Sequence, residues 1–324
     1  MIEILDDDSQ ASIQDRGRFG WRAIGVGSSG AMDPLALERA NLLVGNALDA
    51  ASIEIPGTPL RVGFRTAVQF ALVGAGVAAK LDGLELQPDS TSPAQAGSEL
   101  QVDRPSTGTY SYLAVQGGFE VPLTLGSRST HLRGGFGGYE GRVLARGDLL
   151  AIGAANADKT GVFGMTPPRK TLALPGDVPG ITHVRVLAAA EYQRFSQASH
   201  TAFWTTAWKI SAQSNRSGYR LIGPNLHLET ALEMRSHGLL PGVIQAPNGG
   251  TPIIQLADAF TAGGYPKIGT VVAADLWRVA QAPLGSALRF VQVDYEAARA
   301  AQAVFDADRA KVRMWIDLYR SSGA

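Results

Sequence analysis

The chain contains no cysteine among its 324 residues. This absence excludes disulfide bridges, thiolate zinc sites, iron–sulfur clusters and a cysteine nucleophile. Charged side chains are also scarce, at 18% against a usual value of about 25%, and the 29 basic and 29 acidic residues cancel. A neutral chain does not predict binding to nucleic acid or to an acidic membrane surface. We therefore expect no nucleic-acid partner and no membrane partner.

Leader-like and membrane-spanning segments are missing too. Residues 1–8 carry four acidic side chains, whereas a signal peptide begins with basic residues and continues with apolar ones. The longest nearly apolar run, residues 70–79, falls far short of the roughly 18 residues that predict a membrane span. These two absences predict a cytoplasmic protein.

The motifs of several enzyme classes are also absent. The chain has no P-loop, no nucleophile elbow and no zinc-protease histidine pair. None of its five histidines has a second histidine three or four residues away, so the sequence predicts no metal site on a helix. We expect no metal centre.

Glycine, by contrast, is abundant, with 38 residues, or about 12% of the chain against a usual value of roughly 7%. Short runs rich in β-branched and aromatic residues recur between turn signals from residue 51 to 153, which predicts mostly antiparallel strands. Asp82-Gly83 lies between two of these runs and is typical of a two-residue hairpin turn. One helix is predicted from Asp33 to Gly45, because aspartate caps a helix and Pro34 fits its first turn.

The apolar pattern lapses between residues 154 and 180, which we interpret as a linker between two domains. A second β-rich unit follows, with a strand over 182–187, a helix over 191–204 and a strand over 287–293. A long terminal helix then places apolar side chains on one stripe, which predicts that the helix docks on its own sheet or on a partner. The stripe comprises Ala297, Ala301, Val304, Phe305, Val312, Trp315 and Tyr319.

The predicted domains are therefore residues 1–153 and 181–324. Residues 146–152 and 284–290 both read as a glycine turn that leads into a late strand, so the two halves have the same broad plan. This similarity favours two tandem β-barrels in a mainly β protein with few helices.

Residues 25–30 read Gly-Val-Gly-Ser-Ser-Gly and match the dinucleotide-binding fingerprint. That fingerprint requires a buried strand directly before it and strand–helix alternation after it, and residues 17–23 offer no such strand. We therefore expect no Rossmann site. One alternative to a dinucleotide site stays open. The N-terminal N–H groups of the helix that follows Asp33 could bind a small anion.

Three glycine-flanked clusters of polar side chains are candidates for ligand binding, because glycine permits close approach of the backbone while its neighbours supply donors. The first, residues 125–138, contains two arginines and several hydroxyls, which suit a carboxylate or a phosphate. The second, residues 214–221, has an asparagine, two arginines and a tyrosine. The third, residues 245–267, combines amide side chains with a carboxylate and a lysine that could do acid–base work. The alternative for each cluster is a turn network that satisfies backbone groups.

Six segments, in order and with suitable spacing, resemble the allophanate hydrolase subunit 2 family, which is also called the biotin-dependent carboxyltransferase family. The resemblance extends from about residue 3 to residue 295 and implies two tandem cyclophilin-like β-barrels, in agreement with the strand-rich halves. The segments are residues 13–18, 29–34, 40–46, 125–130, 215–221 and 261–267.

The resemblance implies three candidate activities. One branch of the family contributes to the ATP-dependent opening of 5-oxo-L-proline to L-glutamate, together with two other subunits. A second branch moves a carboxyl group from carboxybiotin to urea or a similar small amide, and a third is regulatory, binding its subunit 1 homologue without chemistry of its own. Because this chain has no fused biotin carrier and no Met-Lys-Met attachment motif, we expect an enzyme of the first branch.

The implied partners and cofactors follow from that choice. The resemblance implies a heteromer with a homologue of subunit 1, which is the B subunit of 5-oxoprolinase, together with the A subunit of that enzyme. Because the chain lacks a P-loop, ATP is expected to be held by another loop type or by these partners. In the carboxyltransferase alternative, carboxybiotin would be attached to a separate carrier.

The substrates of both enzymatic branches are small planar amides. Gln245 or Asn215 suits the C=O and N–H edge of such a molecule. Asp258 and Lys267 are the candidate catalytic pair, because carboxyl transfer needs a base near the accepting nitrogen. A carboxylate or carboxyl group also needs cationic or polar donors. The candidates for this anion-binding role are Arg128, Arg216 and Tyr219.

Overall fold

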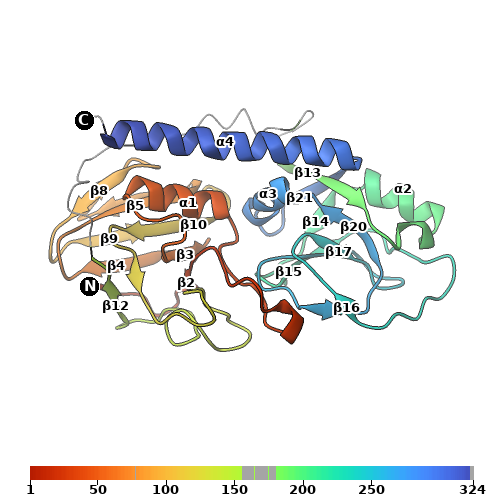
Figure 1. Ribbon diagram of the computed structural model, residues 1–324, viewed down its shortest axis with the longest axis horizontal. Helices are drawn as coiled ribbons and strands as arrows, with labels where there is room; N and C mark the ends of the chain where they lie inside the picture. Colours follow the sequence, from red (N-terminus) through yellow and green to blue (C-terminus); the bar gives the residue numbers. More distant parts are fainter. Residues whose placement is uncertain (77, 155–163, 165–173, 175–179, 322–324) are drawn as a thin grey trace. The chain divides into compact units, whose positions relative to one another are not determined.

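The structure is a computed structural model (Figure 1) that describes residues 1–76, 78–154, 164, 174 and 180–321. It divides into two compact units. Unit 1 consists of Met1–Phe19, Ser29–Pro168 and Arg309–Ala324, and unit 2 consists of Gly20–Ser28 and Arg169–Asp308. Two short segments therefore belong to a different unit from their neighbours in the sequence. The predicted linker, residues 154–180, lies almost wholly outside the described residues, and the domain limits at 153 and 181 stay a prediction.

Unit 1 is built from two sheets whose described strand pairs are all antiparallel. The seven-stranded sheet contains, in spatial order, β11 (Phe119–Glu120), β12 (Leu149–Ile152), β1 (Ile2–Ile4), β4 (Leu60–Phe64), β9 (Glu99–Val102), β6 (Ala79–Leu81) and β7 (Leu84–Glu85). The five-stranded sheet contains β2 (Ser12–Gln14), β3 (Ser52–Pro56), β10 (Thr107–Val115), β5 (Val68–Gly76) and β8 (Thr91–Ala94). The short antiparallel strands predicted from the sequence are confirmed.

Both sheets contribute to one hydrophobic core. Phe64 on β4 and Phe70 on β5 stack with ring centroids 5.2 Å apart, and the inward side chains of β1, β3, β9 and β10 surround them. Each fully buried apolar side chain of this size stabilises the fold by about 1.5–3 kcal/mol. This core gives unit 1 a rigid support for its polar loops.

Local sequence signals in unit 1 form the elements that they predict. Asp82 and Gly83 have φ values of +52° and +81°, and they join β6 to β7 with Leu81 opposite Leu84. Helix α1 (Pro34–Leu43) packs on β5 and β10 (Figure 1). The Asp33 carboxylate accepts hydrogen bonds from two backbone amides of its first turn. The alternative that a small anion binds these N–H groups is therefore wrong, because a side chain of the chain itself caps them.

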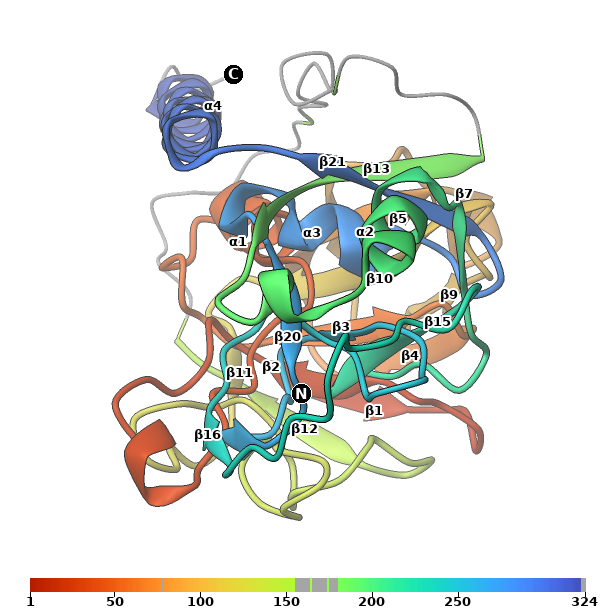
Figure 2. The ribbon, with the colours of Figure 1, turned by 90° about the vertical axis from the view of Figure 1, so that its right-hand side faces the viewer.

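Unit 2 contains a closed seven-stranded barrel. In spatial order its strands are β13 (Ile181–Ala188), β20 (Lys267–Val271), β17 (Val243–Gln245), β18 (Ile253–Gln255), β15 (Gly218–Ile222), β14 (Trp208–Ile210) and β21 (Ala287–Gln292). The barrel closes through a parallel pairing of β13 with β21. Helix α2 (Gln197–Thr205) packs on β21, and helix α3 (Leu276–Gln281) packs on β13 (Figure 2). A separate two-stranded sheet pairs β16 (His237–Gly238) with β19 (Ala262–Gly263).

The mainly β fold with few helices is thus confirmed. The predicted local similarity of residues 146–152 and 284–290 is confirmed as well, because Gly147 and Gly285 have φ values of +87° and +84° and each precedes a late strand, β12 or β21. The structure has a shorter helix than the one predicted over residues 191–204. Residues Tyr192–Arg194 form a 3₁₀ turn, and α2 begins only after Ser196, whose hydroxyl caps it. A second 3₁₀ turn, Ala273–Asp275, leads into α3.

The terminal helix α4 (Tyr295–Ser321) buries a face that matches the predicted stripe only in part. Ala297, Val304 and Tyr319 are exposed. Within unit 2, Ala298 and Ala301 pack on Val272 and Ala274, with Phe305 beside them. In unit 1, Val312 and Ile316 are buried, Arg309 forms a two-pronged ion pair with Glu38 of α1, and Arg320 donates to the Leu43 carbonyl. The predicted stripe is confirmed at Ala301, Phe305 and Val312 and wrong at its exposed members, because small and charged side chains make much of the contact.

Asp148 in unit 1 offers a test of electrostatic stabilisation. Arg142 donates to both oxygens of this carboxylate, at 2.7 and 2.8 Å, and the Ala145 amide donates at 2.8 Å. Burial alone would raise the pKa of Asp148, but these hydrogen bonds outweigh it and hold the pKa below its usual value. A carboxylate with a lowered pKa stabilises the fold above the unfolded pKa of about 3.9, and this contribution is lost as the pH falls further.

We expect Asp148→Asn to lower the free energy of unfolding by about 1–2 kcal/mol at pH 7, because the charge-assisted hydrogen bonds are lost. The difference from the wild type should shrink below about pH 4. Urea unfolding between pH 7 and pH 3 measures both effects, and Asp49→Asn, at an exposed position of unit 1, is the control. An equal loss at pH 7 and pH 3 would show that the charge of Asp148 is irrelevant.

Candidate functional site

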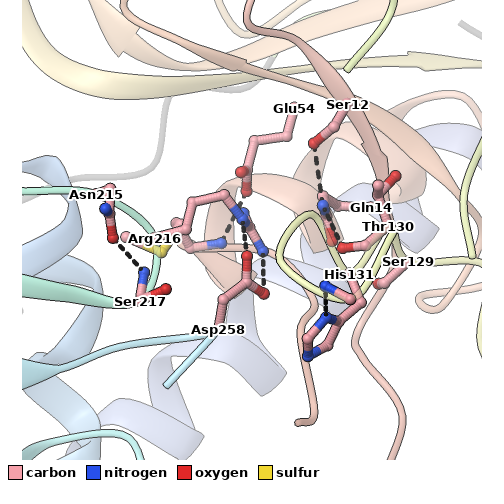
Figure 3. A network of polar contacts seen from close by, with 12 residues as sticks. Ser12, Gln14, Glu54, Ser129, Thr130, His131, Asn215, Arg216, Ser217 and Asp258 are labelled. Atoms are coloured by element: carbon pink, nitrogen blue, oxygen red, sulfur yellow. Dashed lines mark hydrogen bonds and ion pairs between the residues drawn. The ribbon is translucent and has the colours of Figure 1, made fainter. Parts of the chain in front are cut away.

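Arg216 and Asp258 form a buried ion pair in unit 2 (Figure 3). The Arg216 Nε and Nη2 atoms lie 2.9 and 3.3 Å from the two carboxylate oxygens of Asp258, and the two residues are only 8% and 3% exposed. Backbone hydrogen bonds extend the pairing of β15 with β18, since the Asp258 amide donates to the Arg216 carbonyl at 3.0 Å. Two of the three predicted clusters are thus joined by one antiparallel ladder.

The other two candidates within residues 214–221 differ in exposure: Asn215 lies at the surface and Tyr219 is buried. Asn215 is exposed, and its Oδ1 accepts from the Ser217 amide at 2.9 Å, which is the turn network of the alternative interpretation. Tyr219 is 1% exposed, and its hydroxyl donates to the Ala280 carbonyl at 3.1 Å. Because that hydroxyl has a single hydrogen, this geometry does not support an anion-binding role for Tyr219.

Two primary amides, Gln245 and Gln255, lie on the neighbouring strands β17 and β18. Gln255 Nε2 donates to Gln245 Oε1 at 3.1 Å, and Gln245 Nε2 donates to the Tyr265 carbonyl at 3.2 Å. Gln245 is buried, at 4% exposed, and among the described residues one N–H and one lone pair of its amide have no further partner. Gly263 permits this arrangement, because a Cβ atom there would lie 3.0 Å from Gln245 Nε2 and 2.8 Å from a Leu239 methyl group.

Lys267 begins β20 opposite Gln245. Its Nζ contacts His237 Nε2 and lies 4.0 Å from a Glu191 carboxylate oxygen, which also accepts from the Lys267 amide at 3.1 Å. The structure gives Lys267 and Asp258 different partners, and their role as a catalytic pair stays a prediction. The extended β15–β18 ladder places Asp258 beside Arg216, with which it forms an ion pair. Lys267, at the start of β20, instead lies near Glu191 and near His237 of β16.

The sequence interpretation missed both partners of Lys267. His237 is 30 residues from Lys267 along the chain and comes near it because β16 pairs with β19, with His237 opposite Gly263. Glu191 lies just before the 3₁₀ turn, where the sequence predicted a helix. The only available signal was residue type, since histidine and glutamate are common acid–base groups.

The first predicted cluster lies in unit 1 and is largely a structural network around Asp15. This carboxylate accepts from the Ser127 hydroxyl at 2.7 Å, the Ser129 hydroxyl at 2.5 Å, the Arg128 amide at 2.5 Å and the Gly17 amide at 2.7 Å. The interpretation as a turn network is thus correct for these hydroxyls. The Arg128 guanidinium donates through Nε to the Val121 carbonyl at 3.0 Å. Its two terminal NH₂ groups make no hydrogen bond within the described part of the chain and suit an anion.

The adjoining polar groups of unit 1 serve the same network. Gln14 Nε2 donates to the Ser12 hydroxyl and to the Thr130 carbonyl (Figure 3). Gly137 is required by packing, because a Cβ atom there would lie 2.4 Å from the Ser129 carbonyl oxygen and 2.6 Å from Arg18 Nη2. The glycines of residues 134–138 therefore bring two stretches of chain together, and ligand binding is not needed to explain them.

The dinucleotide fingerprint at residues 25–30 lacks its structural context, as expected. The residues before it form a 3₁₀ turn, Arg22–Ile24, that ends at Gly25 with φ of +88°. Arg22 donates to the carbonyls of Leu239 and Phe260 and holds this segment to unit 2. Its burial lowers the pKa of the guanidinium from its usual value.

Two further searches concern the described residues only. Within residues 1–76, 78–154, 164, 174 and 180–321, no group of three or more His, Cys, Asp or Glu side chains could hold a metal ion. None of the helices described here has the length and apolarity needed to cross a membrane.

The polar end of the unit 2 barrel can therefore do two things. The Gln245 amide can pair with the C=O and N–H edge of a small amide. The Lys267 ammonium, next to an imidazole and a carboxylate, can transfer a proton. This combination suits reactions at a carbonyl–nitrogen bond.

The sequence matches the model of the carboxyltransferase domain, subdomains A and B, over residues 24–292. This match covers most of the chain. The chain belongs to the carboxyltransferase family. The family resemblance carried by the six sequence segments is thereby confirmed.

Some curated relatives from this family are named as the C subunit of 5-oxoprolinase, and others are named as urea amidolyase. The chain is 44% identical over 302 residues to the 5-oxoprolinase C subunit of Escherichia coli (strain K12), covering 93% of this chain and 94% of that protein. It is 40% identical over 298 residues to the 5-oxoprolinase C subunit of Haemophilus influenzae, covering 92% and 93%. It is 31% identical to urea amidolyase of Saccharomyces cerevisiae, covering 92% of this chain and 17% of that protein.

Solved structures of the family have the same fold. The urea amidolyase of Kluyveromyces lactis has a TM-score of 0.86 at 28% identity, covering 96% of this chain and 20% of that chain. A structure named TTHA0988 has a TM-score of 0.79 at 28% identity, covering 90% of this chain and 56% of that one. This carboxyltransferase-family chain therefore corresponds to one part of each larger protein.

Proposed function

We propose that the protein is the C subunit of an ATP-dependent 5-oxoprolinase complex that opens the lactam ring of 5-oxo-L-proline to give L-glutamate. The observation that carries this proposal is the near full-length match to two proteins named as the C subunit of 5-oxoprolinase, at 44% and 40% identity. The urea amidolyases match over less than a fifth of their own length. A chain that aligns with its relatives over nearly their whole length fits the separate protein of the 5-oxoprolinase complex better.

The residues of unit 2 suit this substrate. The ring amide of 5-oxoproline presents one C=O and one N–H, which complement the remaining N–H and lone pair of Gln245. Asn215 offers a second exposed amide, and Arg216 is the candidate cation of this unit for the substrate carboxylate. Arg128, in unit 1, stays a separate candidate for anion binding. Asp258 then acts as a positioning residue, because its carboxylate orients the Arg216 guanidinium.

Proton transfer is the remaining requirement. Water must lose a proton as it attacks the ring carbonyl, and the ring nitrogen must gain one as its bond to carbon breaks. Lys267 is the candidate group for both transfers. ATP can activate the carbonyl oxygen by phosphorylation, and since this chain has no P-loop, we propose that the partner proteins, the A and B subunits of 5-oxoprolinase, help to hold it.

A second candidate is transfer of a carboxyl group from carboxybiotin on a separate carrier to urea or a similar small amide. The family model itself is a carboxyltransferase domain, and the fold matches Kluyveromyces lactis urea amidolyase with a TM-score of 0.86. The same amide and lysine groups would serve that reaction, because urea also presents a C=O and N–H edge.

The test is to produce the chain together with the A and B subunits of 5-oxoprolinase, purify the complex and measure glutamate released from 5-oxo-L-proline. We expect release that requires ATP and all three proteins. An assembled complex that releases no glutamate would overturn the proposal. Carboxylation of urea with a carboxybiotin carrier would then support the second candidate, and inactivity in both assays would support a purely regulatory role.

A further inference from the structure

Two glutamine side chains of unit 2 form a chain of hydrogen bonds with a single direction. The Tyr265 carbonyl oxygen can only accept, so the Gln245 side-chain atom 3.2 Å from it is the NH₂ nitrogen. The oxygen of that amide, Oε1, then faces Gln255, and the Gln255 atom 3.1 Å from it must also be an NH₂ nitrogen. The chain of donors thus runs from Gln255 through Gln245 to the Tyr265 carbonyl.

The surroundings hold both amides in place. Gln245 and Gln255 are only 4% and 6% exposed. Gln255 lies opposite Gly218 in the β15–β18 ladder, and its backbone carbonyl accepts from the Gly242 amide at 2.7 Å. Gly263 packs against the Gln245 amide, because a Cβ atom there would lie 3.0 Å from Nε2 and 3.5 Å from Oε1. Backbone therefore bounds the Gln245 amide on one side, and Gln255 bounds it on another.

A reversed Gln245 amide would lose both of its hydrogen bonds. If its oxygen and nitrogen exchanged places, the oxygen would face the Tyr265 carbonyl and the nitrogen would face the Gln255 NH₂ group. One contact would then join two acceptors and the other would join two donors. The observed orientation also has an electronic effect, because donation from Gln255 polarises the Gln245 amide and strengthens its remaining N–H as a donor.

This orientation decides what the Gln245 amide can recognise. Within the part of the chain that the structure describes, one N–H and one lone pair of this amide have no partner. A complementary molecule carries a C=O and an N–H on the same edge, as the ring amide of a lactam does. A lactone of the same shape has a ring oxygen in place of the N–H, and this oxygen would face the Gln245 oxygen with no hydrogen between them.

We propose that Gln255 is the positioning residue that fixes the Gln245 amide and thereby makes the site select a lactam over the corresponding lactone. Gln245 touches the substrate, and Gln255 acts through it. The substrate carbonyl accepts from the Gln245 N–H, and the substrate N–H donates to the Gln245 oxygen, which also accepts from Gln255. The inference rests on the proposed function only for the identity of the lactam, 5-oxo-L-proline.

The first experiment does not depend on activity. In the full chain labelled with ¹⁵N in its glutamine side chains, NMR measures how fast the NH₂ protons exchange with water, and Gln245→Met assigns the Gln245 signals by removing them. We expect slow exchange at Gln245 in the wild type and exchange at least about tenfold faster in Gln255→Met. Unchanged exchange at Gln245 in that variant would overturn the positioning role, whether or not the complex hydrolyses 5-oxoproline.

The second experiment measures selectivity in the complex assembled with the A and B subunits of 5-oxoprolinase. The probe is 5-oxotetrahydrofuran-2-carboxylate, the lactone that corresponds to 5-oxoproline, added as a competitor while glutamate release is followed. In Gln255→Met we expect the ratio of the lactone inhibition constant to the lactam KM to fall by about tenfold, the effect of one well-placed hydrogen bond, with a smaller change in kcat. Gln213→Met, at an exposed glutamine of the same unit, should leave the ratio unchanged.

A second variant separates the lost donor from the shape of the new side chain. Gln255→Leu removes the same donor and should lower the ratio as Gln255→Met does, and thermal unfolding checks that each variant folds. If the folded variants change the lactam KM and the lactone inhibition constant by the same factor, or change neither, Gln255 only supports the barrel and the proposal is overturned. A wild-type complex that assembles but releases no glutamate would instead contradict the proposed function, and the exchange rates at Gln245 then decide the role of Gln255.

Discussion

Replacing Lys267 with methionine is expected to lower kcat of the assembled complex by about 10²–10⁴-fold, with a much smaller change in KM. The magnitude is that of a lost general acid–base group. Methionine keeps an unbranched apolar side chain but cannot carry a proton. The contacts of Lys267 Nζ with His237 and Glu191 place the ammonium group at the polar end of the barrel, so its removal should affect the chemical step more than the fold.

A matched control is available in the same barrel. Lys209 on β14 is exposed, and Lys209→Met removes the same charge from the same unit at a position outside the polar cluster. Steady-state kinetics of glutamate release should place this variant within twofold of the wild type. Equal activity of Lys267→Met and the wild type would show that Lys267 is not the acid–base group, whatever the activity of the complex.

Replacing Asp15 with alanine is expected to lower the free energy of unfolding by about 3–5 kcal/mol. Asp15 is 6% exposed, and its carboxylate accepts from two serine hydroxyls and two backbone amides. Removal leaves these donors buried without their acceptor, and each such group costs about 1–3 kcal/mol. The losses are not additive, because the hydroxyls can rotate towards other acceptors.

Asparagine at position 15 separates charge from shape. Asp15→Asn keeps one acceptor oxygen, so we expect roughly half the loss of Asp15→Ala. Urea unfolding of both variants at pH 7, with Asp49→Ala at an exposed position as the control, measures the difference. A loss below about 1 kcal/mol in Asp15→Ala would show that the loop of residues 125–130 is held by other contacts.

Several elements of the fold were predictable because they depend on neighbouring residues alone. Asp82-Gly83 forms its hairpin since both positions need positive φ, which aspartate tolerates and glycine prefers. Asp33 and Pro34 begin α1 because one caps the free amides and the other lacks an N–H to satisfy. Gly147 and Gly285 lead into late strands for the same local reason.

The terminal helix shows where local pattern fails. Its existence followed from periodicity, but its buried face followed only in part, because the predicted stripe also included exposed apolar residues such as Val304 and Tyr319. The real face includes the small Ala298 and the charged Arg309 and Arg320, whose partners lie more than 270 residues away. A hydropathy pattern counts arginine as a polar surface residue, so it cannot predict that an arginine lies on the contact face of a helix.

The candidate site was predictable in composition but not in its pairing. The sequence indicated Gln245, Arg216, Asp258 and Lys267 as polar groups in glycine-rich segments. It joined Asp258 to Lys267 because they are near each other along the chain. The β15–β18 ladder instead places Asp258 against Arg216.

By itself, the sequence determined that this is a mainly β protein of the carboxyltransferase family without thiol chemistry, because composition, turns and caps are properties of short segments. Only the tertiary structure decided which polar side chains act together. His237 reaches Lys267 through the pairing of β16 with β19, and Glu191, directly before a 3₁₀ turn, lies 4.0 Å from the Lys267 ammonium nitrogen. Strand register fixes such contacts, and register depends on how distant segments pack, which no local pattern encodes.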